Sequence, residues 1–384
     1  MRLLIFGVAI VAACAVIGGR KNLWATETNR STTGEPTKPL EPQTKNPGGW
    51  PYADVYDEVT AAGELNRVRY EDDHIRLVEV GYFPGVHSPM HGQPWASVVA
   101  YDSSEPSALE DTNLYPKSEL NGQGAGHGPA PQGLQNPTCE TMKPRAPHAV
   151  TNNDSFPLHY FRLEFKRIDG DGLQANWKAW YPWMLLPIKT IANIDPRDPN
   201  LGPPVSKEYP FAYATESYKA APNNHRLLYE DDHILFLEVA VRPGERENLH
   251  GHSFPSVFAF DVGPVRVSGP TPIPATVPPL PEDRQPGMGH GVGGGDYRLD
   301  PYGRNGQGGG TGGPPEGMKW PSCTTMGPQW PHAVGVANDY PLHFYRIEYK
   351  RIDGDGIKTH WREWYPWMAT LADDRNEHAQ QANR

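Results

Sequence analysis

The hydrophobic and polar positions of the chain alternate over short stretches, which is the pattern of β-strands. In the segment LHFYRIEYKRI one face carries a mostly apolar set: His343, Tyr345, Ile347 and Tyr349. The other face carries Phe344, Arg346, Glu348 and Lys350. An earlier segment, LHYFRLEFKRI, repeats this pattern, with a first face of His159, Phe161, Leu163 and Phe165. Because strand side chains alternate between two faces, we expect the first face of each segment to point inward.

Other stretches support the same structural class. The runs HIRLVEV, HILFLEV, ASVVAYD and PSVFAFD are short and apolar, and we find no long amphipathic helix. The 40 glycines and 42 prolines favour loops over helices. Short strands separated by Gly/Pro turns predict an all-β fold, a sandwich or barrel.

Most of the chain consists of two copies of one sequence. RYEDDHIRLVEVGYFPG matches LYEDDHILFLEVAVRPG, and a long block beginning PHAV occurs in both halves. Such a repeat indicates a duplication. We predict a first module over residues 50–186, a linker over 187–208, a second module over 209–371 and a frayed tail over 372–384. The glycine-rich inserts inside the modules are predicted to be flexible loops, some of which can act as lids.

The N-terminus predicts export. Residues 1–24 contain an arginine, an apolar run and small residues, the pattern of a secretory signal. VAAC, ending at Cys14, also resembles a lipoprotein signal, and an uncleaved anchor is a third possibility. All three place the protein outside the cytoplasm, in the periplasm or at the cell envelope, with membrane contact only through this segment. Residues 25–49 are predicted to be a flexible tether. The net charge of -10, without a basic cluster, argues against a nucleic-acid partner.

Two histidines in the second module have the spacing of metal ligands. His250 and His252 are two residues apart in a predicted strand, so both side chains project to the same side. His332 lies at a neighbouring predicted strand. Three imidazoles from two strands can hold one face of a divalent transition metal and leave positions open for substrate.

These residues carry a resemblance to a known superfamily. PGERENLHGH and PHAV…DYPLHFYRIE resemble the two motifs of cupins, and YEDDHIRLVEV…PG is similar to the first strand of small bacterial cupins. Two such modules resemble a bicupin. The resemblance implies two tandem cupin-type (double-stranded β-helix) barrels, an RmlC-like jelly roll. It also implies a bound Fe, Mn, Ni, Zn or Cu ion.

The resemblance transfers a ligand set to each module. In the second module it assigns the metal to His250, His252 and His332, without the glutamate that usually follows the second histidine. In the first module it assigns a weaker site: His91, Gln93 and His148. A glutamine amide is a poor transition-metal ligand, so the second site is predicted to be the stronger. The alternative is a decayed barrel in which all of these are ordinary buried residues.

Other histidines receive different interpretations. His159 and His343, on the face predicted to point inward, are interpreted as core histidines, or else as groups that hold the metal ligands from behind or act as an acid or base. His74, His87 and His233 are predicted to be surface or turn residues. WKAWYPWM and WREWYPWM are predicted to plug a barrel end or a module interface, with ligand stacking as the alternative. The RIDGDG repeats predict tight turns rather than calcium loops.

Two function classes remain open. One is a metal-dependent enzyme, an oxygenase, lyase or isomerase, acting on a small organic acid, phenolic or sugar-derived substrate. The other is a non-catalytic protein that binds a small ligand or a cell-wall component.

The two cysteines beyond the N-terminal segment raise a separate question. Cys139 and Cys323 each lie nine residues before the PHAV histidine of their module (148 − 139 = 9; 332 − 323 = 9). Equivalent residues near a pseudo-twofold axis meet, so we predict an inter-module disulfide. The alternative buries each cysteine in its own barrel.

Overall fold

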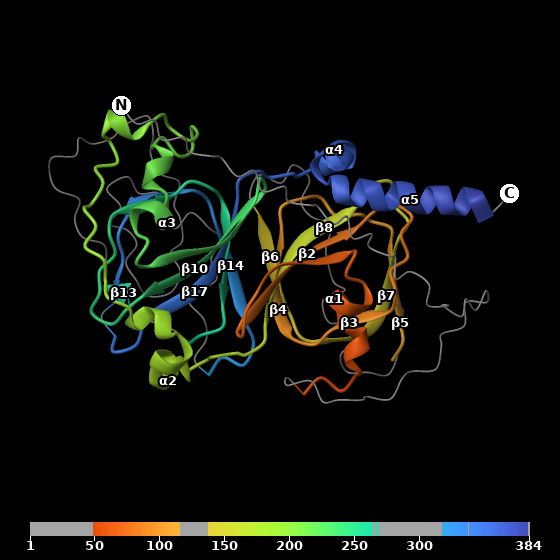
Figure 1. The fold of residues 1–384 in the computed structure, drawn as a ribbon, viewed down its shortest axis with the longest axis horizontal. Helices are drawn as coiled ribbons and strands as arrows, with labels where there is room; N and C mark the ends of the chain where they lie inside the picture. The colour runs from red at the N-terminus through yellow and green to blue at the C-terminus, as the bar shows by residue number, and fades with distance from the viewer. Residues whose placement is uncertain (1–48, 116–136, 264–266, 269–316, 337, 383–384) are drawn as a thin grey trace, which may run out of the picture. The chain divides into compact units, whose positions relative to one another are not determined.

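The computed structural model describes residues 49–115, 137–263, 267–268, 317–336 and 338–382. These residues form antiparallel sheets with a few helices, so the predicted all-β class is confirmed (Figure 1). The predicted export signal and tether lie outside the described residues. Most residues of the two long glycine-rich inserts also lie outside the described residues. The export signal, the tether and the flexible loops therefore stay predictions.

The first module has two sheets. The five-stranded sheet has the order β1-β2-β8-β4-β6, with bounds Asn66–Glu71, Ile75–Tyr82, Leu158–Phe165, Ala96–Tyr101 and Thr138–Met142. The three-stranded sheet has the order β3-β7-β5, with bounds His91–Gln93, Arg145–Asn152 and Leu109–Asn113. The helical segments are η1 (Asp54–Tyr56), α1 (Glu58–Ala61), α2 (Leu173–Trp180) and η2 (Pro182–Leu185).

The second module repeats this arrangement after η3 (Pro199–Leu201), η4 (Tyr213–Thr215) and α3 (Ser217–Ala220). Its five-stranded sheet has the order β14-β12-β17-β10-β9, with bounds Ser322–Met326, Ser256–Phe260, Leu342–Tyr349, Ile234–Val241 and His225–Glu230. Two short pairs complete it: β11 (His250–His252) with β15 (Gln329–His332), and β13 (Val267–Ser268) with β16 (Gly335–Val336). Helices α4 (Ile357–Trp364) and α5 (Pro366–Ala382) end the chain.

The apolar faces of β8 and β17 lie between the modules, so the predicted inward orientation is wrong. One buried cluster joins the two five-stranded sheets: Ile75, Leu77, Val98, Ala100, Phe161, Leu163 and Phe165 with Ile234, Phe236, Val257, Ala259, Tyr345, Ile347 and Tyr349. The alternate face, with Arg162 and Glu164 or Arg346 and Glu348, lines each barrel. Both faces of these strands are buried, and the more apolar one packs against the other sheet.

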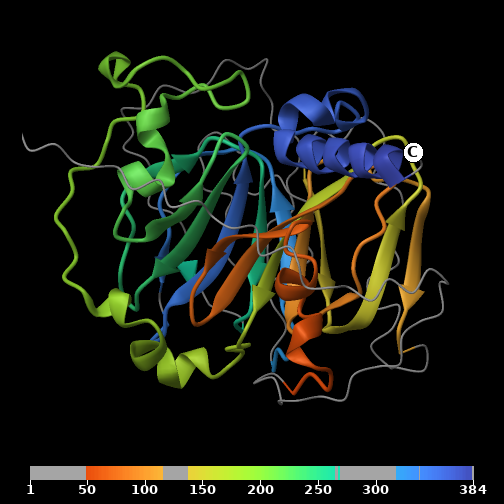
Figure 2. The same cartoon turned by 45° about the vertical axis from the view of Figure 1, so that its right-hand side comes forward.

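A disulfide links the two modules across this interface, and each module also contributes a tryptophan-bearing helix that packs with the other. Cys139 in β6 and Cys323 in β14 form the predicted inter-module disulfide, with a Cα–Cα distance of 6.3 Å. Trp177 of α2 packs with Ala240 of the second module. Trp361 of α4 packs with Val80 of the first, and Figures 1 and 2 show α4 and α5 beside the first module's strands. The aromatic segments therefore occupy the module interface, one of the two predicted positions.

Helix α5 contradicts the prediction of a frayed tail. It runs for 17 residues, and its first turns insert Met368 and Ala372 into the first module's core. A Cβ at Gly81 would overlap the side chains of Trp367 and Met368, which explains the glycine. The helix escapes sequence detection because only its first turns are buried. In the described part of the chain, no helix has both the length and the hydropathy needed to cross a bilayer.

Two local predictions have opposite outcomes. The RIDGDG segments are tight turns, in which Gly170 and Gly354 adopt positive φ angles of 52° and 48°. His233 is not a surface residue. It is 6% exposed, and its Nε2 lies 2.6 Å from Oδ2 of Asp102 in the other module. The prediction failed because the ion-pairing partner of His233 lies in the other module, and the local sequence around His233 does not reveal it.

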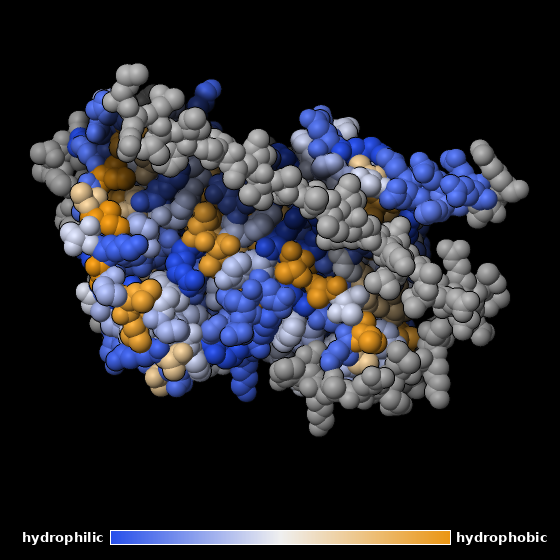
Figure 3. Space-filling view, in the orientation of Figure 1, coloured by the Kyte–Doolittle hydropathy of each residue, from blue (hydrophilic) through white to orange (hydrophobic). Residues whose placement is uncertain are grey.

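The visible surface is mostly polar. On the face seen in Figure 3, hydrophobic residues form small separate groups among hydrophilic ones. The extensive apolar surfaces of the two sheets are used in the module interface instead.

Candidate metal centre

The strand register brings the three predicted histidines of the second module together. In the antiparallel pair β11–β15, His250 lies opposite His332, and a bulge separates this pair from the pair of His252 and Gln329. The ring centroids of His250 and His252 lie 4.6 Å and 5.5 Å from that of His332. His250 and His252 are buried, whereas His332 is partly exposed. A Cβ at Gly251 would overlap the ring of Tyr209, so this position between the histidines requires glycine.

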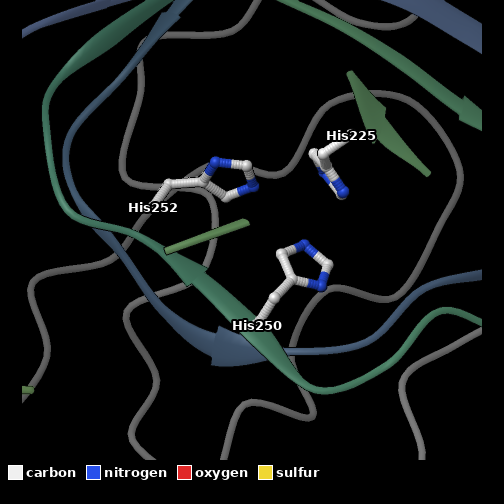
Figure 4. A group of neighbouring side chains, drawn as sticks. All are labelled: His225, His250 and His252. Carbon is white, nitrogen blue, oxygen red and sulfur yellow. The ribbon is translucent and has the colours of Figure 1, made fainter. Parts of the chain in front are cut away.

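A fourth histidine, which the sequence analysis missed, completes the cluster. His225 at the start of β9 has its ring centroid 4.4 Å from that of His250 and 5.2 Å from that of His252. Figure 4 shows these three imidazoles pointing into one common space. The repeat contained a signal, because the second copy has histidine exactly where the first has Asn66, just as it has His252 where the first has Gln93.

Hydrogen bonds fix which nitrogen of each ring is free. Nδ1 of His250 lies 2.8 Å from the carbonyl oxygen of Asn248, and Nδ1 of His332 lies 2.8 Å from that of Trp330. A carbonyl only accepts, so Nδ1 carries the proton and Nε2 of the neutral ring keeps its lone pair. Nδ1 of His252 lies 2.7 Å from Oε1 of Glu348, which holds that ring the same way.

Burial keeps all four rings neutral. It lowers the pKa of His332 to about 4 and that of His225 to about 3. Burial, with neighbouring imidazoles and Arg346 as smaller causes, holds the pKa of His250 and of His252 well below the ordinary value. Neutral imidazole is the form that binds a metal, so the cluster needs no proton loss at neutral pH.

The cluster fits a divalent transition metal. Ligand atoms of His225, His250 and His252 all lie within 4.8 Å of one another. Nitrogens bound to one metal at about 2.1 Å are at most about 4.2 Å apart, so a small contraction is enough. Nδ1 of His225 is buried without a hydrogen-bond partner, which is costly unless it meets a ligand. All-imidazole donors suit Zn, Cu, Fe or Ni.

Three buried carboxyl groups surround the histidines. Glu247 lies beside two of the rings, with Oε1 3.9 Å from Nδ1 of His225 and Oε2 4.0 Å from Nε2 of His250. Burial raises the pKa of Glu247 to about 8. Glu216 and Glu348 lie behind His252, on its Nδ1 side, and form a second group with it. Burial, and next the Glu216 charge, raise the pKa of Glu348 well above its ordinary value.

The corresponding place in the first module is filled differently. His91 and His148 face each other in register, with ring centroids 4.6 Å apart. The hydroxyl of Tyr82 lies 2.9 Å from Nε2 of His91, and the amide of Gln93 donates to Glu58 at 2.9 Å. The predicted residues are therefore together, but protein groups already use Nε2 of His91 and the amide nitrogen of Gln93.

The candidates behind the ligands lie elsewhere. His159 and His343 sit on the interface face of β8 and β17, opposite to the face of Arg162 and Arg346. Nε2 of His159 lies 3.1 Å from Oε1 of Glu79, and Nε2 of His343 lies 3.0 Å from Oε1 of Glu238. The groups that contact the second module's ligands are instead Glu348 and backbone carbonyls.

A separate open groove contains none of these histidines. It has a volume of about 440 Å³ and is formed by the inter-module linker and the edge of the second module, with Val205, Tyr213, Phe254 and Lys350 among its lining residues.

Comparison with known proteins finds similar solved structures at low scores only. No protein-family model matches the chain, and no curated protein matches it. Similar solved structures include a cupin domain from Bordetella pertussis Tohama I, with 17% identity, a TM-score of 0.19, and coverage of 27% of this chain and 92% of that one. A cupin 2 conserved barrel domain protein from Leptotrichia buccalis has 6% identity, a TM-score of 0.17 and coverage of 73% and 86%. The formate complex of Lactobacillus farciminis oxalate decarboxylase has 12% identity, a TM-score of 0.15 and coverage of 73% and 78%. At these scores the likenesses carry no argument about either fold or function.

Proposed function

We propose that this chain is a two-barrel protein of the cupin type whose second module holds one divalent transition metal and acts as a metal-dependent enzyme on a small organic substrate. The observation that carries this proposal is the convergence of the ligand atoms of His225, His250 and His252, with an orphaned nitrogen on His225 and the ring of His332 beside that of His250. His225, His250, His252 and His332 would hold the metal. When bound, such a metal acts as a Lewis acid that polarises a substrate oxygen.

The chain's own groups supply the rest of the chemistry. Glu348 and the carbonyls of Asn248 and Trp330 hold the rings by their Nδ1 atoms. Glu247 is the carboxyl beside Nε2 of His250 and is suited to hold and transfer a proton. A positioned proton carrier favours lyase or isomerase chemistry over oxygenase chemistry, because those reactions move a proton on the substrate.

The alternative is a non-catalytic ligand-binding protein. The first module supports this alternative. There the hydroxyl of Tyr82 already contacts Nε2 of His91, so this barrel would have a structural role only. Turnover of a panel of small organic acids, phenolics and sugar derivatives by metal-loaded protein distinguishes the two. Binding without any turnover favours the alternative.

We also propose that the protein acts outside the cytoplasm. The Cys139–Cys323 disulfide supports this, because structural disulfides persist in oxidising compartments. Fractionation of cells that produce the full-length chain tests this proposal.

Metal analysis of purified protein tests the centre itself. We expect about one metal per chain for wild type, and loss of that metal in the His250→Ala/His252→Ala double variant. His91→Ala, at the equivalent position of the first module, is the matched control and should keep the metal. Retention of the metal in the double variant would contradict the assignment.

A further inference from the structure

Both modules have a buried arginine at the same position, but its hydrogen-bond partners differ between them. In the first module, Nη1 of Arg162 donates to Oε2 of Glu58 at 2.5 Å, and Nη2 donates to the hydroxyl of Tyr160 at 2.8 Å. Arg346 is the equivalent residue of the second module, because each arginine lies four residues after the first residue of β8 or β17. There, the positions of Glu58 and Tyr160 are Ser217 and Phe344.

Arg346 has therefore lost both partners that satisfy its counterpart. It is 1% exposed, and its Nη1 donates to Oε1 of Gln329 at 2.5 Å. Its Nε lies 2.9 Å from Oε1 of Glu348, an oxygen that is also bonded to His252. Its Nη2 is buried and has no hydrogen-bond partner. An unsatisfied buried donor of a charged group is costly, so the second barrel is built for a ligand acceptor.

Neighbouring carboxyl groups do not supply that acceptor. Oε2 of Glu348 is also buried without a hydrogen-bond partner and does not bond to Nη2. Both oxygens of Glu216 are used, Oε1 by the backbone N–H and hydroxyl of Ser217 and Oε2 by the N–H of Ser253. Glu247 accepts from the N–H of Val334 on the other side of the cluster. The flat face of the guanidinium lies 4.5 Å from the ring of Phe258, which holds its plane.

We propose that the second barrel binds a small carboxylate, with Nη2 of Arg346 donating to it beside the histidine cluster. A guanidinium edge matches the planar, charged oxygens of a carboxylate better than any neutral acceptor. This inference deepens the proposed function, on which it rests, by naming the substrate class as small organic acids. A carboxylate held at Arg346 would lie near His252, since Oε1 of Glu348 lies 2.9 Å from Nε of Arg346 and 2.7 Å from Nδ1 of His252.

The test is calorimetric titration of full-length, metal-loaded protein with acetate, with acetamide as the neutral isostere. We expect one acetate site per chain and no acetamide binding. Ser217→Glu/Phe344→Tyr rebuilds the arrangement around Arg162 and should weaken acetate binding about tenfold or more at unchanged metal content. Arg346→Lys should weaken acetate binding similarly, because lysine keeps the positive charge but lacks the paired N–H donors of the guanidinium. Glu58→Ser in the first module is the matched control and should leave the acetate affinity of the second site unchanged.

The outcomes separate this inference from the proposed function. Wild-type protein that holds metal but binds no acetate overturns the carboxylate site and leaves the metal centre standing. Equal acetate affinity in wild type and both second-module variants also overturns it. Protein that binds no metal contradicts the proposed function, and the same titration still decides whether Arg346 binds a carboxylate.

Discussion

The hydroxyl of Tyr82 lies 2.9 Å from Nε2 of His91, at a position where the second module has Val241. This contact places a protein group on the nitrogen that would face a metal. The two modules therefore differ at three positions of the centre, where the first has Asn66, Tyr82 and Gln93 and the second has two histidines and a valine.

The first prediction follows from this difference. Gln93→His alone should not add a second metal, because Tyr82 still occupies Nε2 of His91. Asn66→His/Tyr82→Val/Gln93→His should raise the metal content from about one to about two per chain, as measured by elemental analysis. A second tightly bound metal in wild-type protein would show that the tyrosine does not block the site.

The second prediction concerns the carboxyl group behind His252. Glu348→Gln keeps the shape but replaces the carboxyl oxygen beside Nδ1 of that ring with a weaker amide acceptor. Metal affinity should fall about 10- to 100-fold, measured by competition with a chelator. Glu164→Gln is the matched control in the first module, where Glu164 pairs with Arg76. Equal losses in both variants would indicate a general effect on folding.

The third prediction concerns the disulfide. Its cysteines are 184 residues apart, so the chain-entropy model gives at most about 5 kcal/mol of stabilisation. Cys139→Ala/Cys323→Ala should lower the denaturation midpoint by a clear margin and should leave metal content unchanged. Thiol titration of denatured, unreduced wild type should find neither thiol free. Two reactive thiols would rule out the pairing.

The fourth prediction is a pH dependence of the module interface. Burial lowers the pKa of His233, but the charge and hydrogen bond of Asp102 together with the charge of Asp353 outweigh burial, so the pKa is raised. A raised folded-state pKa stabilises the fold fully below about pH 6.5, and this contribution is lost as pH rises through the raised value. The groups that face His233 are Asp102, Asp353, Arg351, Tyr365, His159, Phe161 and Tyr349.

Melting curves from about pH 6 to pH 9 provide the measurement. Wild type should lose stability over this range, to which the ionisation of Asp261 and Glu247 also contributes, since burial raises their pKa values to about 7 and about 8. Asp102→Asn should make the fall of the melting temperature with pH shallower. The control Asp73→Asn, at an exposed position, should leave this slope unchanged. Parallel curves for wild type and Asp102→Asn would remove His233 as a cause.

The sequence alone determined the duplication, the all-β class and the shared side of His250 and His252. Each depends on local periodicity or on direct comparison of the two copies. The sequence could not decide which face of β8 and β17 lines the barrel. Alternation assigns each residue to one of two faces, but both faces are buried, so polarity does not show which one points into the barrel. The sequence left Cys139 and Cys323 with two alternatives, because sequence spacing does not measure distance.

Only the tertiary structure decided which groups meet at the centre. His225 joins it from β9, Tyr82 fills the first module from β2, and Arg346 lacks the carboxyl partner that α1 supplies to Arg162. The burial of His233 against Asp102 likewise depends on the docking of the two modules, because the two residues are 131 positions apart in sequence. These relationships arise from long-range packing, in which a side chain's partners are set by sheet register and module docking rather than by its neighbours along the chain.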